Sequence, residues 1–163
     1  KNIWYPEWVA GSVILIQKDF FKKIGKWSED KFWMYSEDPD ICLKSNKNGK
    51  KIALLRNVEI KHQHGGSSRR NTKTTAITKS EVVTSSHVFI HEHSSSINRV
   101  ALHLVIMVNT LTSWLLRTLI TLPFFWKDFF KANLFTLLAI IKYYLSVLIR
   151  WNWKSKRLKK NES

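Results

Sequence analysis

The sequence predicts an α/β fold for residues 1–75, a connecting helix or linker at 76–98, and apolar, membrane-associated helices with a basic tail at 99–163. Three observations support this division. Short β-type apolar runs alternate with helix caps and stops in the first region. Every acidic residue except Asp128 and Glu162 lies before residue 97, and apolar residues dominate after it. With 163 residues, 44% of them apolar, the chain is long enough to bury a core.

The first region is expected to begin with a strand and a short helix. GSVILIQ (11–17) is an apolar run of β-type residues, which predicts a strand. FFKKI (20–24) predicts a helix that is capped by Asp19 and ended by Gly25. A strand followed by a helix is typical of α/β domains.

A second helix and two further strands complete this region. Pro39 suits the first turn of a helix through ICLKSNKN, with Asp38 as its cap and Gly49 at its exit. KIALLR and VEIKH predict two short strands. Residues 65–79 are polar and basic and begin with glycine, which predicts a loop. The run SEVVTSSHVFIHEHSSS that follows predicts a helix of low intrinsic propensity, because it is rich in serine and β-branched residues.

The carboxy-terminal region is apolar and helical by pattern. Its first helix carries a polar stripe within about 40° of one line on an apolar body, which suits a bilayer interface or a hydrophobic bundle. The stripe consists of Arg99, His103, Thr110, Ser113 and Arg117. Pro123 ends this helix, and the run 129–149 that follows is about long enough to cross a bilayer core of about 30 Å. Three arrangements remain open: attachment to a membrane surface, a transmembrane hairpin, and a soluble helical bundle.

The net charge limits the possible partners, and the single cysteine limits the possible cellular compartment. A formal net charge of +15 indicates an anionic partner, which is nucleic acid, an anionic lipid surface or a phosphorylated substrate. The tail RWNWKSKRLKK pairs tryptophans with cations, as in a lipid headgroup layer, although a solvated basic tail has the same composition. Cys42 is the single cysteine, which excludes an internal disulfide and fits a reducing compartment. The opening residues show no signal peptide, and we expect the chain to be part of a longer protein.

Three carboxylates, Glu37, Asp38 and Asp40, follow the aromatic run FWMYS at the predicted start of the second helix. Taken alone, acids at this position predict a helix cap. The flanking segments change this interpretation. In order and spacing, WVAGSVILIQKDFFKKIGKW, FWMYSEDPDICLK and GKKIALLRNVEIKHQHGGSS resemble the carboxy-terminal half of the catalytic domain of family 2 glycosyltransferases, in particular bacterial rhamnosyltransferase-type enzymes of polysaccharide assembly.

The resemblance covers about the first 70 residues. Trp27-Ser28 stands where the family usually has Phe-Asp, and Trp33 replaces an aromatic Phe. The matching positions are Trp8, Gly11, Ser12, Phe21, Ile24, Gly25, Glu29, Phe32, Tyr35, Glu37, Asp38, Asp40, Gly49, His62, Gly65 and Ser67. The resemblance implies the carboxy-terminal half of a Rossmann-like GT-A domain. It also implies an inverting transfer from a nucleotide-sugar donor to a lipid-linked or saccharide acceptor.

The resemblance also implies roles for single residues. Asp38 is the expected general base, which takes the proton of the acceptor hydroxyl and must therefore face a cavity rather than only backbone amides. Glu37 is expected to hold the acceptor or to orient Asp38, and Asp40 to stabilise the helix amino terminus by its charge. The expected sugar contacts are Trp8, Gly11 and Tyr35, although for the two aromatic residues burial in a core is the simpler role.

The donor and metal contacts are expected downstream. Ser67, Arg69 and Arg70 would bind the donor diphosphate, unless the segment is only a solvated basic loop. His62, with His64 as a weaker candidate, would contact a divalent metal, Mg or Mn, whose other ligands are expected in the amino-terminal half of such an enzyme.

Two other functions compete with the enzymatic one: a basic nucleic-acid-binding module and a non-catalytic membrane-interaction module. The sequence contains no helix-turn-helix, zinc-finger or RNP-type pattern, and its basic tail adjoins apolar helices that nucleic acid does not explain. We therefore expect no nucleic-acid partner. The expected location is the cytoplasmic face of the inner (plasma) membrane, with a peripheral or anchored chain at an anionic lipid surface.

Overall fold

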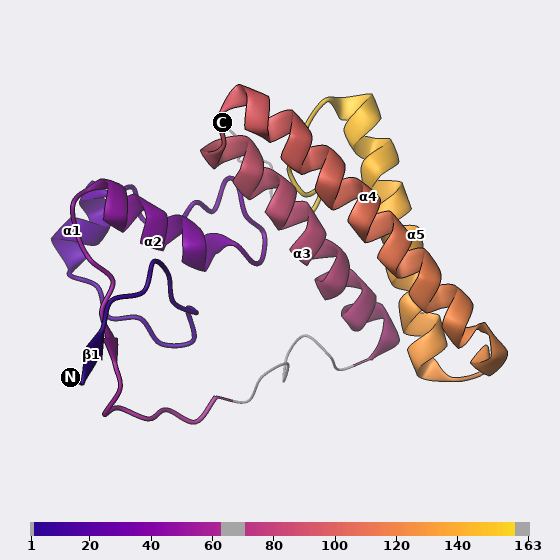
Figure 1. Cartoon of the computed structure of the whole chain (residues 1–163), viewed down its shortest axis with the longest axis horizontal. Helices are drawn as coiled ribbons and strands as arrows, with labels where there is room; N and C mark the ends of the chain where they lie inside the picture. Colours follow the sequence, from indigo (N-terminus) through magenta and orange to yellow (C-terminus); the bar gives the residue numbers. More distant parts are fainter. Residues whose placement is uncertain (1, 63–70, 159–163) are drawn as a thin grey trace.

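The computed structural model describes residues 2–62 and 71–158. Two short amino-terminal helices lie at one end of the molecule, and three long helices lie side by side at the other (Figure 1). The elements are β1 Ile3–Trp4, α1 Lys18–Lys23, α2 Glu37–Lys47, β2 Leu54–Leu55, α3 Thr72–His93, α4 Ser96–Thr121, the 3-10 turn η1 Leu122–Phe124, and α5 Asp128–Arg150.

The predicted α/β fold is wrong. Most of the described residues are helical, and in this part of the chain the sheet consists of β1 and β2 alone, paired antiparallel with Ile3 opposite Leu55. The segment 11–17 forms no strand, because no neighbouring strand is present to accept its backbone hydrogen bonds. The segment 58–62 is also irregular. The described residues therefore do not have the Rossmann-like GT-A architecture that the resemblance implied.

The two short helices pack around a small apolar core of their own. The predicted end of α1 is confirmed, because Gly25 adopts a left-handed φ of 86° just after it. Helix α2 begins at Glu37, so that Asp38 lies in its first turn rather than at the cap. Its core contacts are Ile41 and Cys42, each 2% exposed, which pack against Ile24 and against half-buried side chains of the segment 11–17.

Helix α3 begins a full two turns before the prediction. The loop predicted over 65–79 is wrong from Thr72 onward, because the Asn71 side chain accepts a hydrogen bond from the Thr74 N–H (2.9 Å) and caps a helix there. Although α3 packs against both α4 and α5, most of its buried residues are polar. Hydroxyl groups among them donate hydrogen bonds to backbone carbonyls of the same helix. Thr84, for example, donates to the Ser80 carbonyl one turn earlier.

Helices α4 and α5 form an antiparallel hairpin against α3, and both predicted helices are confirmed. Both are long and apolar enough, by length and composition only, to cross a membrane. Their polarity differs from that of ordinary core helices. The buried residues of α4 are His103, Thr110 and Thr118, whereas its large apolar side chains are mostly exposed. The predicted polar stripe therefore faces the bundle at His103 and Thr110, although Arg117 is exposed.

The segment after α5 folds back over the bundle. The Tyr143 hydroxyl donates to the Trp153 carbonyl (2.9 Å), and the Trp153 ring stacks on His103 with ring centroids 4.0 Å apart. Ser155 donates to the buried Glu81 carboxylate (3.0 Å). Only one of the two tail tryptophans, Trp151, is freely exposed, at 93%. The described part of the basic tail is therefore a packed element of the fold.

Candidate functional site

A strained turn precedes α2 and carries the acids singled out by the sequence. Tyr35 and Ser36 both have left-handed φ values, 68° and 64°. In residues other than glycine this conformation costs about 1 to 3 kcal/mol each, and it persists only where the surroundings impose it. Such strain is concentrated at functional sites. The strained turn could not be predicted from the sequence, because neither residue is Gly or Asn.

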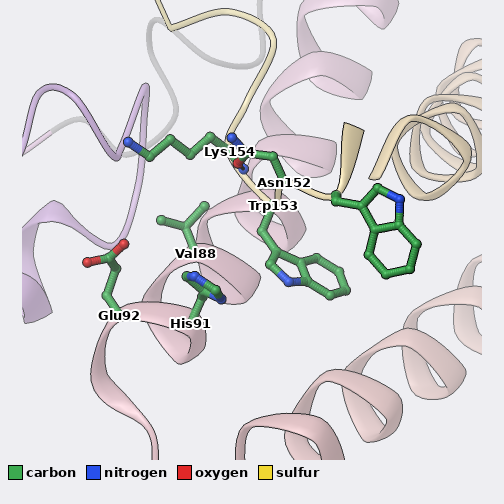
Figure 2. Close-up of a pocket in the computed structure, with 7 residues that line it drawn as sticks. Val88, His91, Glu92, Asn152, Trp153 and Lys154 are labelled. Atoms are coloured by element: carbon green, nitrogen blue, oxygen red, sulfur yellow. Dashed lines mark hydrogen bonds between the residues drawn. The ribbon is translucent and has the colours of Figure 1, made fainter. Parts of the chain in front are cut away.

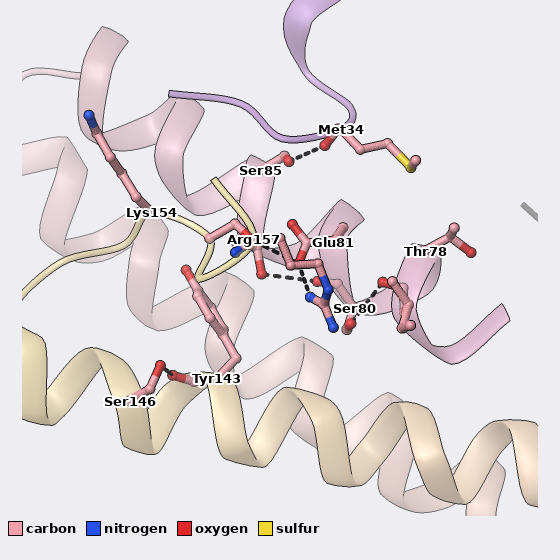
Figure 3. Close-up of polar contacts among 12 residues, drawn as sticks. Met34, Thr78, Ser80, Glu81, Ser85, Tyr143, Ser146, Lys154 and Arg157 are labelled. Atoms are coloured by element: carbon pink, nitrogen blue, oxygen red, sulfur yellow. Dashed lines mark hydrogen bonds and ion pairs between the residues drawn. The ribbon is translucent and has the colours of Figure 1, made fainter. Parts of the chain in front are cut away.

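Contacts with α3 hold the turn in this conformation. The Ser85 hydroxyl donates to the Met34 carbonyl (2.5 Å), directly before the strained pair (Figure 3). Lys31 forms an ion pair with Glu92 of α3 (2.5 Å). The bundle is therefore the frame on which the turn is fixed.

Asp38 lies against Gly11, 27 residues earlier. Its Oδ2 accepts a hydrogen bond from the Gly11 N–H (2.7 Å). A Cβ at position 11 would lie 2.0 Å from Asp38 Oδ1 and 2.6 Å from its Cγ, so that only glycine allows this approach. Oδ1 makes no hydrogen bond with the described residues, and the side chain is half-exposed. The contact brings together two segments on which the family resemblance depends.

Glu37 differs from its neighbour in environment. Its Oε2 atom is buried and has no hydrogen-bond partner within the described residues. Burial raises the pKa of the Glu37 carboxyl, and the Asp38 charge adds to this, although the backbone N–H of Glu37 acts in the opposite direction. A carboxyl whose pKa is raised by burial is a candidate for a functional group, although the buried Oε2 itself is not accessible to a ligand in this structure.

Asp40 has a structural role rather than the expected effect on the helix terminus alone. It is 2% exposed and accepts from Ser28 (2.8 Å) while pairing with Lys44 (2.9 Å) and with His93 of α3 (2.8 Å). Burial by itself raises the pKa of Asp40, but the hydrogen bonds from Lys44, Ser28 and His93 outweigh it and lower the pKa. The i,i+4 spacing to Lys44 is visible in the sequence. No sequence pattern predicts the contacts of Asp40 with Ser28 and His93.

Asp40→Asn should lower the free energy of unfolding by about 2 kcal/mol at pH 7, because the buried Ser28 and the partly buried Lys44 and His93 lose a charged acceptor. The folded-state pKa lies below the unfolded value, so this contribution is present above about pH 4 and is lost as the pH falls through the folded pKa. Denaturant titrations at pH 7 and at pH 3 measure it, and the wild type should approach the variant at the lower pH. Asp30→Asn is the matched control, since Asp30 is exposed and lies 3.9 Å from Lys154. Equal losses in the two variants would contradict the role of Asp40.

Two other predicted site residues, Trp8 and His62, lie in exposed irregular segments. Trp8 is 57% exposed, in a segment that Asn46 of α2 holds by a hydrogen bond to the Glu7 carbonyl (3.0 Å). His62 lies in an exposed irregular segment after β2. Ser67, Arg69 and Arg70, like His64, lie outside the described residues. Among residues 2–62 and 71–158, no group of three or more His, Cys, Asp or Glu side chains could hold a metal ion.

A shallow cavity of about 200 Å³ lies elsewhere, between α3 and the segment after α5 (Figure 2). Asp38 does not line it, and the hydrogen bond that its carboxylate makes within the described residues comes from a backbone amide, the Gly11 N–H, so neither feature supports the expected placement of the base at a cavity. Its lining consists of Val88, His91, Glu92, Trp151, Asn152, Trp153 and Lys154. None of the residues predicted as a site is among them.

A buried histidine pair beside this cavity was not predicted from the sequence. Nδ1 of His87 lies 2.7 Å from Nδ1 of His103, and Nε2 of His87 lies 3.0 Å from the Tyr144 hydroxyl. Burial lowers the pKa of His87 to about 3, and His103 adds to this, so that His87 is neutral at pH 7. The pair joins α3, α4 and α5 and is a structural feature of the bundle.

Comparison of the chain with models of known protein families, with characterised proteins and with solved structures gives no match. The functional argument therefore depends on the motifs and on the geometry of the turn.

Proposed function

We propose that this chain is part of a membrane-associated glycosyltransferase that transfers a sugar from a nucleotide-sugar donor to a lipid-linked or saccharide acceptor. The observation that supports it most is the contact between Asp38 and Gly11. It joins two segments of the motif, it requires glycine at position 11, and it fixes the carboxylate at the end of a strained turn. Catalytic carboxylates need such a fixed position.

In the proposed reaction Asp38 is the general base. Its Oδ1 takes the proton of the acceptor hydroxyl while the hydroxyl oxygen attacks the anomeric carbon of the donor sugar. The bond from that carbon to the phosphate oxygen breaks, and the nucleoside diphosphate leaves with the bonding electrons, so that the anomeric configuration is inverted. The Gly11 N–H holds Oδ2 and so sets the direction of Oδ1. Glu37, next to Asp38 in the first turn of α2, holds a second hydroxyl of the acceptor or orients Asp38.

The membrane part of the proposal is supported by the surface of the hairpin. A soluble nucleic-acid-binding module does not need large apolar side chains along the outside of α4 and α5, whereas a lipid surface does. The excess of positive charge then serves an anionic lipid surface, which in the proposed location is the cytoplasmic face of the inner membrane.

Gly11→Ala tests the proposed site through its geometry. The new Cβ would overlap the Asp38 carboxylate and force it out of its position, so the expected result is transfer between tenfold and 100-fold slower; stability should change little, because the clash is with a side-chain end rather than with backbone. Membranes from cells that express the whole gene product are incubated with labelled nucleotide sugars, and the product is extracted with organic solvent. Ser12→Ala is the matched control and should keep the wild-type rate. A Gly11→Ala variant that transfers at the wild-type rate would contradict a catalytic role for Asp38.

A further inference from the structure

The outer face of α4 is an apolar surface without a partner among the described residues. Its large side chains recur at helical spacing and are half exposed or more: Leu104, Val108, Leu115 and Leu119. We define these four residues as the α4 outer face. The buried residues of the helix lie elsewhere: His103 and Thr110 are on the opposite side, and Thr118 lies beside the outer face. This polarity is the reverse of that of a helix in a water-soluble bundle.

We propose that α4 lies flat in the membrane interface, with its outer face in the acyl-chain boundary of one leaflet, and does not cross the bilayer. The inference deepens the membrane association in the proposed function and is independent of the sugar chemistry. Three observations carry it: the charge of the hairpin, the aromatic turn at its tip, and the position of α3 beside the middle of α4.

The charge of the hairpin selects lipid as the occupant of this face. Between residues 96 and 150 the cations are Arg99, Arg117, Lys127, Lys131, Lys142 and Arg150, and the one acid is Asp128. An apolar face within a cationic surround is complementary to acyl chains under anionic headgroups.

The tip between α4 and α5 continues the same surface. Phe125 and Trp126 are 63% and 56% exposed, and their rings meet edge to face with centroids 5.1 Å apart. Lys127 follows them directly and is exposed. Aromatic rings beside a cation are typical of the headgroup level of a membrane.

The packing of α3 against α4 argues against an orientation in which α4 crosses the bilayer. In a spanning orientation the middle of α4, around residues 103–114, would lie at the depth of the hydrocarbon core. There, His87 of α3 contacts His103, and the Lys79 Nζ lies 5.1 Å from the Trp114 ring. Crossing the bilayer would therefore carry α3, with Lys79 and the buried Glu81, into the hydrocarbon region, where ionisable groups are costly.

Lys142 provides the same argument against a membrane-spanning orientation of α5. It is exposed and lies fourteen residues from the amino-terminal end of a helix of 23 residues, about 21 Å along an axis of about 35 Å. In a spanning hairpin it would face lipid inside the bilayer. In a hairpin that lies in the interface its ammonium group reaches the headgroups.

Vesicle flotation of the full chain tests the surface. Leu115→Asp should reduce the bound fraction at least fivefold on phosphatidylcholine vesicles that contain 30% phosphatidylglycerol. Val82→Asp is the matched control, since Val82 is similarly exposed (45% against 50%) but lies on α3, and it should stay within twofold of the wild type. Equal binding by the two variants, or self-association of the wild type without vesicle binding, would overturn the proposal, the latter in favour of a second copy as occupant.

A labelling experiment tests the orientation. Lys127→Cys in a Cys42→Ser background, added to sealed vesicles, should react with a membrane-impermeant maleimide from outside without detergent. Lys73→Cys, at the amino-terminal end of α3, is the matched reference and should react equally fast. Protection of position 127 until detergent is added would show a spanning hairpin and overturn the proposal. Sugar transfer, measured on the same samples, reports separately on the enzymatic proposal, which fails alone if flotation and labelling are as expected but no transfer occurs.

Discussion

Asp38→Asn should slow sugar transfer by about 10³-fold while nucleotide-sugar binding stays unchanged. Loss of a general base typically costs 10² to 10⁴ in rate, and the amide cannot accept the acceptor proton. The shape of the side chain is preserved, and the asparagine oxygen can still accept the hydrogen bond from the Gly11 N–H. The decrease should therefore lie in kcat rather than in the donor Kd.

The matched control is Asp40→Asn, which removes a carboxylate two residues away that is already engaged with Ser28, Lys44 and His93. After correction for folded protein, this variant should retain most of the transfer rate. Glu37→Gln should raise KM for the acceptor more than it lowers kcat, because Glu37 binds a hydroxyl in the proposal rather than taking its proton. Wild-type kcat in Asp38→Asn would reject Asp38 as the base.

The long apolar helices were predictable because their pattern extends over more than twenty residues each. Helices of that length and hydrophobicity have few alternatives, and Pro123 marks the break between them. The glycines at 25 and 49 also marked helix ends correctly, since both adopt the left-handed φ that glycine tolerates. These signals depend only on residues close together in the sequence, and the structure of those segments agrees with them.

Two of the three predicted strands failed because strand formation is not a local property, whereas the third, KIALLR, contains β2. The segments 11–17 and 58–62 have β-type composition, but a strand needs a neighbour, and the described chain supplies only the pairing of β1 with β2. The acids of the turn were identified from the motif, whereas their environments were not. The approach of Asp38 to Gly11 and the burial of Asp40 depend on contacts between distant segments.

Arg157→Ala should lower the free energy of unfolding by about 3 kcal/mol, more than Glu81→Gln does. The Glu81 carboxylate is 2% exposed, and it pairs through Oε1 with Arg157 and Ser155, while its Oε2 has no partner among the described residues (Figure 3). Removing the guanidinium leaves a buried charge with one neutral donor. Removing the charge of Glu81 instead leaves a guanidinium that solvent can reach, since the Arg157 side chain is 39% exposed.

This asymmetry is measured by a double-mutant cycle in denaturant. The Glu81→Gln/Arg157→Ala pair should recover about half of the loss seen in Arg157→Ala, because no buried charge remains. Lys156→Ala, a neighbouring exposed cation, is the matched control and should have little effect. Additive effects of the two substitutions would contradict the pairing. Because the Arg157 guanidinium also lies 5.5 Å from the Trp33 ring, its loss should loosen the turn that carries Glu37 and Asp38, and transfer should fall further than the unfolded fraction explains.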